Sequence, residues 1–366
     1  MKNILITGGC GFIGSNFIHY MLNNYDYKII NLDALTYAGN LENLKSIEGN
    51  PNYKFIKGRI EDRKLVSNLI KEEGISFIVH FAAESHVDRS ITDSIPFIKT
   101  NIVGTHVLLE AAKENNIEKF IHISTDEVYG SLGPTGVFTE LTPIQPNSPY
   151  SASKASSDLL VRSYVETFKF PATIVRCTNN YGPYQFPEKY IPLTISNVLD
   201  NQPIPLYGDG LNVRDWIYTE DFCRAIDVVL HKGRIGEVYN AGGNSEETNI
   251  NIAKIILKHL NKPKSLITYV KDRLGHDRRY AMDITKIKNE LGWQLKYKFE
   301  EGIEKTIEWY RQNKGWWMKI KSGEYLNYYK KMYGQRLQEG MQVVKDKVQK
   351  TEDIRLNRES RKGAKS

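Results

Sequence analysis

A glycine-rich loop near the N-terminus is the feature that most constrains the fold of this chain. The segment TGGCGFIG places Gly8, Gly11 and Gly14 between an apolar run at 3–7 and a segment of helical periodicity at 11–24. A strand, a tight turn and a helix in this order are the context that a dinucleotide-binding loop requires. Glycine lets the backbone approach a pyrophosphate closely, and the helix start supplies N–H groups without an intrahelical partner. The loop therefore predicts a phosphate-binding turn at the head of an α/β domain.

The rest of the N-terminal half repeats this alternation of short β-branched runs and amphipathic segments, which favours βαβ units and a parallel sheet. The expected strands lie at 28–32, 53–57, 76–80, 119–124 and 172–177, and the expected helices at 62–73, 95–115 and 151–168. We therefore predict an α/β fold with a Rossmann-type doubly wound parallel sheet in residues 1–178. A later strand near 237–241 is expected to return to this sheet.

Beyond residue 178 the composition of the chain changes. Pro, Gly and Tyr become frequent through 181–216, and long helical patterns give way to short segments. We expect residues 179–318 to form a smaller, mixed α/β substrate-binding domain at the carboxyl edge of the sheet. The chain ends in a basic extension, 319–366, whose composition predicts a partly helical segment that becomes frayed or disordered from about Glu339 onward.

The formal net charge of +7 belongs to this extension, which carries thirteen Lys and Arg against six Asp and Glu. The remaining residues are neutral and offer no broad basic face, so we expect no nucleic-acid partner. No apolar run approaches the roughly 18 residues of a membrane helix, and the run that follows Met1 is too short for a secretion signal, so no membrane partner is expected.

The three cysteines and the histidines do not have the spacing of a metal site. Cys10, Cys177 and Cys223 are widely separated and odd in number, which fits neither a disulfide framework nor a zinc site. We therefore expect no metal, and a reducing, cytoplasmic setting. Cys177 falls on a predicted core strand and is interpreted as a small buried apolar residue.

Asp33 ends the second predicted strand, about 20 residues after the glycine loop. A carboxylate at this position can accept hydrogen bonds from both hydroxyls of an adenosine ribose. It would repel a 2′-phosphate. The sequence therefore favours NAD over NADP as the cofactor.

Two groups of polar residues are candidates for acid–base chemistry. Thr125, Asp126 and Glu127 follow the strand at 119–124, and residues just past the carboxyl ends of strands line the ligand crevice of a doubly wound sheet. Tyr150 and Lys154 stand four residues apart, which puts the phenol and the ammonium on one helix face. Free tyrosine has a pKa near 10, and a nearby ammonium and an oxidised nicotinamide would both stabilise its phenolate.

Several stretches together resemble the extended short-chain dehydrogenase/reductase family and, within it, the dTDP-glucose 4,6-dehydratases. The likeness spans the first 320 or so residues and both predicted domains. Besides the glycine loop, it rests on the stretches DALTYAGNL at 33–41, AAESHVD at 82–88, STDEVYG at 124–130, NNYGP at 179–183, FPEK at 186–189, RDW at 214–216 and the segment 273–279.

The resemblance implies a closed redox cycle on a nucleotide-linked glucose. Tyr150 would take the proton of the sugar 4-hydroxyl while hydride leaves C4 for NAD, and Thr125 would hydrogen-bond the same oxygen. Glu127 would remove the C5 proton, Asp126 would protonate the departing C6 hydroxyl, and hydride would return to C6 to give a 4-keto-6-deoxy sugar. Sugar 4-epimerases of similar fold lack this acid–base pair, and the related uronate decarboxylases typically keep the glutamate without the aspartate, so Asp126 beside Glu127 favours elimination of water.

The resemblance also implies binding residues. For the cofactor, beside the loop glycines and Asp33, they are Phe12, Ile13, Leu35, Thr36, Ile60, Ala82, Ala83, Thr100, Tyr150, Lys154 and Asn179. For the substrate they are Ser85, Thr125, Asn180, Lys189, Tyr190, Pro205, Tyr207, Asn249, Arg273 and His276. Arg214 suits a diphosphate by the charge and fork geometry of its guanidinium, and a surface ion pair with Asp215 or Glu220 is the alternative. For His276 a packed or solvated ring is an equal alternative.

The resemblance further implies a homodimer built on the helices at 100–115 and 153–168. The apolar residues that could supply its surface, or equally belong to the core, are Ile102, Leu108, Leu109, Leu159 and Leu160. Two departures from the family pattern stand out. Arg59 replaces an aspartate that bonds the adenine amino group, so adenine would stack on Arg59 or be held by the backbone of Ile60. Leu274 replaces a common proline, a milder change.

Three other functions remain open from the residues alone. The nucleotide could be UDP, because the same hexose chemistry would run on either nucleotide sugar. An epimerase or a decarboxylase is a second possibility, against which Asp126 counts. A catalytically silent Rossmann protein used for binding is a third, and such a protein would need none of the catalytic side chains that this chain carries.

Overall fold

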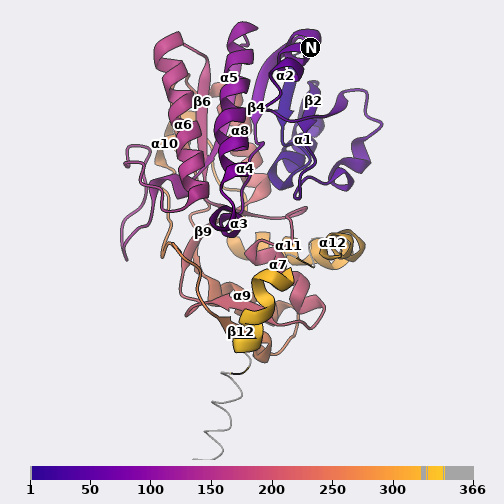
Figure 1. The fold of residues 1–366 in the computed structure, drawn as a ribbon, viewed down its shortest axis with the longest axis vertical. Coiled ribbons are helices and arrows are strands. Elements are labelled where there is room, and N and C mark those ends of the chain that lie inside the picture. Colours follow the sequence, from indigo (N-terminus) through magenta and orange to yellow (C-terminus); the bar gives the residue numbers. More distant parts are fainter. Residues whose placement is uncertain (1, 323–326, 328, 341, 343–366) are drawn as a thin grey trace, which may run out of the picture. The chain divides into compact units, whose positions relative to one another are not determined.

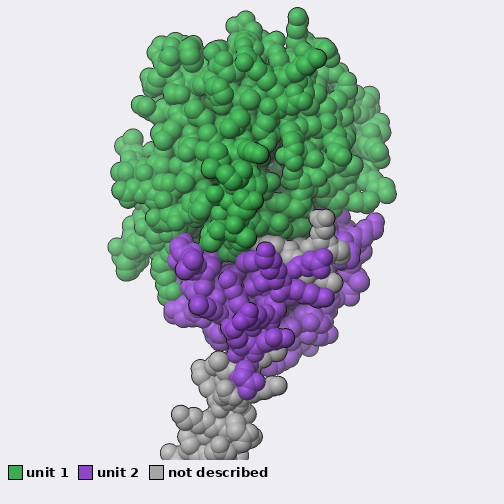
Figure 2. Space-filling view, viewed as in Figure 1, with its two compact units in different colours: residues 1–186, 212–247, 277–312 green, residues 187–211, 248–276, 313–366 purple. Residues whose placement is uncertain are grey.

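The computed structural model describes residues 2–322, 327, 329–340 and 342. The chain forms two compact units, shown in different colours in Figure 2. The first unit comprises residues 1–186, 212–247 and 277–312, and the second comprises residues 187–211, 248–276 and 313–366.

A seven-stranded parallel sheet forms the centre of the first unit. Its strands are β1 (Asn3–Thr7), β2 (Lys28–Asp33), β3 (Tyr53–Lys57), β4 (Ile75–His80), β5 (Lys119–Thr125), β6 (Ala172–Cys177) and β10 (Val238–Ala241). They lie in the order β10-β6-β5-β4-β1-β2-β3. Ile4 on β1 lies beside Ile29 on one side and Phe77 on the other. This arrangement confirms the predicted doubly wound fold, and the strand order reverses between β1 and β4, where such folds bind ligands.

Helices cover both faces of this sheet (Figure 1). On one face α1 (Phe12–Asn24) packs beside α8 (Thr219–Lys232), and on the other α5 (Thr105–Glu114) packs between α2 (Arg63–Glu72) and α6 (Pro149–Phe168). Alternate residues of β1 join opposite cores: Ile4 and Ile6 pack under α1 and α8, whereas Leu5 packs under α2 and α5. Burial on both faces is the reason that these strands read as continuous apolar runs.

The helix predicted at 95–115 is divided into three pieces. The short helix α4 (Ile95–Phe97) leads into a π-helical segment, η2 (Ile98–Gly104), which continues as α5. The amide of Asn101 in η2 accepts from the Glu84 backbone N–H (2.9 Å), and donates to the Glu84 carbonyl (3.0 Å) and to Ser153 Oγ on α6 (2.8 Å). The apolar periodicity does not reveal this wider turn, because it serves a buried polar contact.

Two later segments complete the first unit, beyond the boundary that we expected at residue 178. Val238 on β10 lies beside Ile174 on β6, as expected of a returning strand. A second, three-stranded sheet consists of β7 (Asn179–Tyr181), β9 (Val213–Tyr218) and β11 (Glu246–Thr248). The helix α10 (Thr285–Leu291) packs against β10, and α11 (Phe299–Gln312) packs against β9. The segments 212–247 and 277–312 therefore belong to the first unit, because their elements pack on its strands.

The second unit is built on a short parallel pair, β8 (Ile204–Tyr207) and β12 (Ile267–Val270), with α7 (Tyr190–Leu199) and α9 (Asn249–His259) against β8. Its core joins Leu193 and Val270 to Tyr333 and Leu337 of the basic extension. Tyr333 lies in a π-helical segment, η5 (Lys330–Gly334). Part of the extension is thus helical and packed. Of the tail predicted to fray from about Glu339 onward, residues 341 and 343–366 lie outside the described residues.

The remaining short elements are η1 (Leu41–Ile47), α3 (Val87–Thr92), η3 (Asp126–Tyr129), η4 (Lys264–Leu266) and α12 (Lys314–Lys321). In the part of the chain that the structure describes, no helix combines the length and the apolar composition needed to cross a bilayer.

Candidate active site at the carboxyl ends of the parallel strands

The glycine loop between β1 and α1 leaves no room for a side chain at Gly8 or Gly14. Gly8 has a φ of +73°, and a Cβ atom there would stand 2.7 Å from the backbone of Ala82. A Cβ atom at Gly14 would stand 2.4 Å from the carbonyl oxygen of Gly8. The loop therefore needs glycine at both positions to turn sharply and to bring the helix close to the strand.

The start of α1 is free of side chains that could cap it. Gly11 is the N-cap residue, and the first turn, which contains Phe12 and Ile13, holds no acidic residue. The first N–H groups of a helix have no intrahelical acceptor, and the helix dipole makes this end positive. These groups fit the pyrophosphate of a dinucleotide, as the sequence predicted.

Asp33 ends β2 beside this loop and orders it. Its Oδ2 accepts a hydrogen bond from the Cys10 N–H and its Oδ1 one from the Leu35 N–H, each at 2.8 Å. Leu35 has a φ of +51°, so the chain turns sharply as it leaves β2. Each carboxylate oxygen has a second lone pair that a ribose hydroxyl could use. Burial raises the pKa of Asp33, and the two backbone hydrogen bonds oppose that rise.

The segment after β3 contains the departure at Arg59. Its guanidinium lies 3.8 Å from Glu61 Oε1, and most of the side chain is exposed. Thr100 Oγ1 donates a hydrogen bond to the same glutamate (3.1 Å). Ile60 is buried, and a Cβ at Gly104 would stand 2.5 Å from its Cδ1 atom. Ile60 and Thr100 therefore lie close to each other in the first unit. Two residues that contact the same end of a cofactor have to lie close together in this way.

Thr125, Asp126 and Glu127 lie where β5 ends. Thr125 is the N-cap residue of η3: its Oγ1 accepts a hydrogen bond from the Glu127 N–H (3.3 Å) and donates one to Asp126 Oδ1 (3.1 Å). The Asp126 side chain is only 2% exposed, whereas Glu127 is half-buried. The two neighbouring carboxyl groups therefore have different environments.

The environment of Asp126 favours its protonated form. Burial, and next the charge of Glu127, raise the pKa of Asp126 well above its usual range, and the hydrogen bond from Thr125 and then the charge of Arg214 oppose this rise. Among the described residues, Asp126 Oδ2 has no hydrogen-bond partner. Burial and a neighbouring carboxylate both disfavour the ionised form of a carboxyl group. Asp126 can therefore donate a proton.

Tyr150 and Lys154 begin α6, whose capping box at Ser148 and Ser151 and whose Pro149 fix the helix start. Both side chains are buried, and Lys154 Nζ donates to the carbonyl of Ile123 on β5 (2.7 Å). Burial lowers the pKa of Lys154 to about 8. Burial, then Glu127, raise the pKa of Tyr150 well above 10, while a hydrogen bond with Thr125 opposes the rise. The structure thus joins the two groups of residues that the sequence singled out separately.

Arg214 on β9 lies near the same carboxyl groups. Its guanidinium donates to the carbonyls of Val213 (2.7 Å) and Asp277 (3.0 Å) and lies 4.3 Å from the centroid of the Tyr280 ring. The arginine is buried, so the alternative of a surface ion pair does not describe it. Tyr280 was missed by the sequence reasoning. It is buried, and after burial itself the charge of Glu127 is the largest influence that raises the pKa of Tyr280.

The other predicted residues of the first unit lie on segments that follow its strands. Ala82, Ala83 and Ser85 follow β4, and the Ala82 N–H donates to Thr7 Oγ1 (3.3 Å). Asn179 and Asn180 form β7, directly after β6. The Oδ1 atoms of both asparagines are buried and have no hydrogen-bond partner within the described residues. The backbone carbonyl of Thr36 accepts a hydrogen bond from the Gly39 N–H in the turn that follows Asp33.

The second unit carries the remaining predicted substrate contacts. Tyr190 begins α7, and its hydroxyl donates to the carbonyl of Asn249 at the start of α9 (2.5 Å). Pro205 and Tyr207 belong to β8, and Tyr207 packs edge-on against His276, whose Nδ1 lies 2.6 Å from Asp272 Oδ1. Lys189 is the N-cap residue of α7, and Arg273 follows Asp272. Within this unit, therefore, Tyr190 and Asn249 lie together, and so do Tyr207 and His276.

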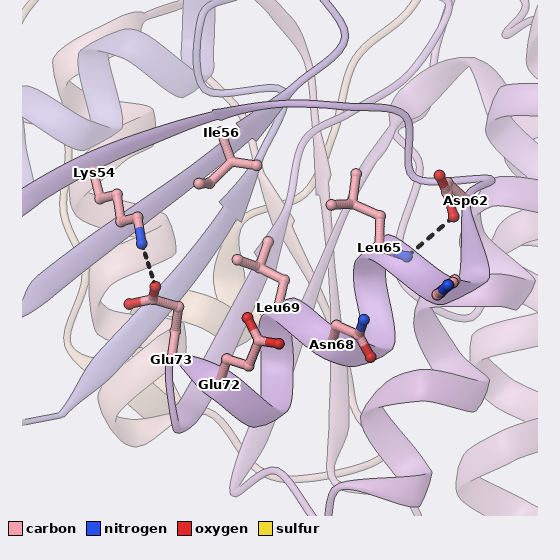
Figure 3. A pocket seen from close by; sticks show the side chains of 9 residues that line it. Lys54, Ile56, Asp62, Leu65, Asn68, Leu69, Glu72 and Glu73 are labelled. Carbon is pink, nitrogen blue, oxygen red and sulfur yellow. Dashed lines mark hydrogen bonds and ion pairs between the residues drawn. The ribbon is translucent and has the colours of Figure 1, made fainter.

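A hollow of about 390 Å³ lies elsewhere on the first unit, between β3 and α2 (Figure 3). Lys54 and Glu73 form an ion pair at one end of it, and Asp62 caps α2 at the other. Leu65 and Leu69 form part of its wall. None of the predicted site residues lines this hollow, so it is separate from the candidate active site.

Comparison with known proteins agrees with this geometry. A family model described as GDP-mannose 4,6 dehydratase matches residues 5–306. The dTDP-glucose 4,6-dehydratase of Xanthomonas campestris pv. campestris (strain B100) is 51% identical over 343 residues, which cover 89% of this chain and 97% of that protein.

Solved structures of dTDP-glucose 4,6-dehydratases are also similar to this chain. The dTDP-glucose 4,6-dehydratase of Bacillus anthracis in complex with NAD has a TM-score of 0.83 and 56% identity, covering 87% of this chain and 100% of that one. DesIV, the dTDP-glucose 4,6-dehydratase of Streptomyces venezuelae with NAD and TYD bound, has a TM-score of 0.85 and 47% identity, with the same coverage.

These matches confirm the resemblance that the motifs indicated. The family model matches residues 5–306, a range that includes segments of both units. The chain belongs to the GDP-mannose 4,6 dehydratase family and, within it, to the dTDP-glucose 4,6-dehydratases.

Proposed function

We propose that this protein is an NAD-dependent dTDP-glucose 4,6-dehydratase that converts its substrate to dTDP-4-keto-6-deoxyglucose. One observation carries the proposal: a buried carboxyl group whose pKa is raised, Asp126, stands beside the half-buried Glu127 and close to Tyr150. Elimination of water needs one carboxyl group that donates a proton and one that accepts a proton. The relatives' names support dTDP-glucose as the substrate.

The residues of the first unit suit a bound NAD. The glycine turn, the uncapped start of α1 and the carboxylate of Asp33 offer backbone donors to a pyrophosphate and acceptors to a ribose. When bound, NAD would supply hydride transfer from C4 of the sugar and back to C6. The solved relatives whose titles name NAD support this choice of cofactor.

The protein's own side chains would divide the proton transfers. Tyr150, with Lys154 on the same helix face, would take the proton of the 4-hydroxyl. The Thr125 hydroxyl would turn from Asp126 and donate its hydrogen bond to that oxygen as the ketone forms. Glu127 would then remove the C5 proton, which the ketone acidifies. Asp126 would give its proton to the departing C6 hydroxyl, which leaves as water. Arg214 would neutralise charge near the diphosphate.

The test presents the purified, NAD-supplemented protein with dTDP-glucose and with UDP-glucose in separate reactions. Mass spectrometry of the products should detect the 4-keto-6-deoxy sugar, with a higher kcat/KM for dTDP-glucose. A higher kcat/KM for UDP-glucose would show that the protein is a UDP-glucose 4,6-dehydratase instead. No product from either substrate would refute the dehydratase assignment.

We further propose that the protein forms a homodimer through exposed apolar residues of α4, η2 and α6. Ile95, Ile98, Val103 and Leu159 are between 44% and 54% exposed, and α6 contacts both α4 and η2. Leu108 and Leu109, which the sequence offered for this surface or for the core, belong to the core. The cytoplasmic setting stays a prediction, which the three free, buried cysteines support.

A further inference from the structure

Behind Lys154 lies a buried charged cluster that the proposed chemistry does not use. Asp158 stands one turn further along α6, is 1% exposed, and accepts a hydrogen bond at Oδ2 from Arg176 Nε on β6 (2.8 Å). Its Oδ1 lies 3.3 Å from His122 Nε2 on β5. Arg176 in turn donates to the hydroxyl of Tyr129 (2.9 Å). An unpaired buried charge costs several kcal/mol, so a fold keeps such a cluster only with its charges in balance.

The geometry brings Lys154 to the edge of this cluster. Residues four apart on a helix share one face, and both Lys154 and Asp158 are buried on α6. Lys154 Nζ donates to the carbonyl of Ile123, the residue that follows His122 on β5. The ammonium and the carboxylate therefore point at the same stretch of β5. Each acts on the other: Asp158 raises the pKa of Lys154, and Lys154 helps to lower the pKa of Asp158 to about 2.

Among the charged groups of this cluster, Asp158 is the one that can act as a counter-ion for Lys154. Burial holds the pKa of His122 down to about 4, and that of His80 on β4 well below its usual range, so both rings are neutral at pH 7. Arg176 is a cation on β6. The other charged or titratable groups that act at this site are Cys177 on β6, which raises the pKa of Lys154, and the carboxyl groups of η3, which raise the pKa of Tyr150.

We propose that Asp158 is a positioning residue that keeps Lys154 in its charged form and so allows Tyr150 to act as the base. The inference rests on the proposed function, because it concerns the same proton transfer. Asp158 carries one negative charge against the two cations Arg176 and Lys154. With Asn at this position, the two buried cations would share no counter-ion on α6, and Lys154 would lose its proton. A neutral lysine no longer stabilises the Tyr150 phenolate.

The first experiment compares pH profiles of the NAD-loaded wild type, Asp158→Asn and Asp158→Glu with dTDP-glucose. For Asp158→Asn we expect kcat at pH 7 to fall by about tenfold or more, and the rising limb of the kcat profile to move up by about one pH unit. KM should change by less than about twofold, because the buried carboxylate does not touch substrate. In Asp158→Glu, which restores the negative charge, the rising limb of the kcat profile should lie close to that of the wild type.

A matched control separates this effect from loss of stability. Asp221 on α8 is also fully buried, and it accepts hydrogen bonds from the N–H groups of Lys296 (2.9 Å) and Tyr297 (3.0 Å). Asp221→Asn should lower the unfolding midpoint and leave the pH profile in place. An equal shift of the kcat profile in Asp221→Asn would overturn the proposal. A pH profile of Asp158→Asn that superimposes on that of the wild type would also overturn it, and so would an Asp158→Glu profile identical to that of Asp158→Asn.

A second measurement does not depend on turnover. Urea unfolding of the wild type, Asp158→Asn, Lys154→Met and the double variant forms a double-mutant cycle. Asp158→Asn should lower the unfolding midpoint less in the Lys154→Met background, where no second cation remains. Additive changes would refute the coupling even if the wild type turned over neither sugar nucleotide, so failure of this inference and failure of the proposed function are distinguishable.

Discussion

The hydroxyl of Thr125 donates a hydrogen bond to Asp126 Oδ1 at 3.1 Å, while Asp126 Oδ2 is buried without a partner among the described residues. This pair presents a protonated carboxyl group held in one orientation. Asp126→Asn keeps the shape and the hydrogen bond but cannot give a proton. We expect elimination to slow by roughly 10²–10⁴-fold and C4 oxidation to persist, so that reduced nicotinamide accumulates during single turnover.

The measurement is absorbance of reduced nicotinamide together with mass spectrometry of the quenched sugar. Glu127→Gln serves as the companion variant, since it should also retain oxidation but lose exchange of the C5 proton with solvent. Loss of C4 oxidation in Asp126→Asn, with no reduced nicotinamide formed, would show that the roles are assigned wrongly.

The second prediction concerns the cofactor turn. Gly8→Ala places a methyl group 2.7 Å from the backbone of Ala82 and forces alanine to a φ of +73°. The left-handed conformation alone costs about 1–2 kcal/mol. We expect a lower Tm and at least about tenfold weaker NAD binding, read by calorimetric titration. Gly49→Ala is the control, because a Cβ there meets nothing within 4 Å. Equal NAD affinity in both variants would contradict the proposed site.

The third prediction is acid lability caused by His122. Burial lowers the pKa of this ring to about 4 from an ordinary value of 6.5. Between these two values the unfolded chain binds the proton and the folded protein does not, so stability is full above pH 6.5 and falls as the pH drops toward 4. The loss approaches roughly 3 kcal/mol. Urea unfolding across this range should show a shallower pH dependence for His122→Gln, whereas His259→Gln, at an exposed site on α9, should follow the wild type.

The fourth prediction tests the proposed dimer surface. Leu159→Arg places a charge on α6 in the proposed surface of α4, η2 and α6, where burial against a second copy would leave it unpaired. Sedimentation velocity should find the wild type as a dimer and this variant as a monomer. Leu141→Arg, at a position that is 93% exposed and outside these helices, should stay dimeric. A dimeric Leu159→Arg variant would exclude this face.

Sequence reasoning went furthest where the physics is local. The strands β1, β3 and β6 have the predicted bounds, because short runs rich in apolar and β-branched residues between turn residues can be recognised locally. The glycine loop, Asp33 and the Tyr150–Lys154 pair were visible for the same reason: each depends on spacing along one strand, turn or helix. The adjacent carboxyl groups at 126 and 127 are equally visible in the sequence, and the resemblance to the dTDP-glucose 4,6-dehydratases connects them with dehydration.

Only the tertiary structure decided what depends on contacts between distant segments. It assigned residues 212–247 and 277–312 to the first unit, because the pairing of β10 with β6 and the packing of α11 on β9 join positions far apart in the chain. It placed Tyr280 near Glu127, and Asp158 against Arg176, contacts for which the sequence carries no periodic signal. Adjacency alone left Asp126 and Glu127 equivalent. Unequal burial, which is a property of the folded chain, made Asp126 the one that keeps its proton.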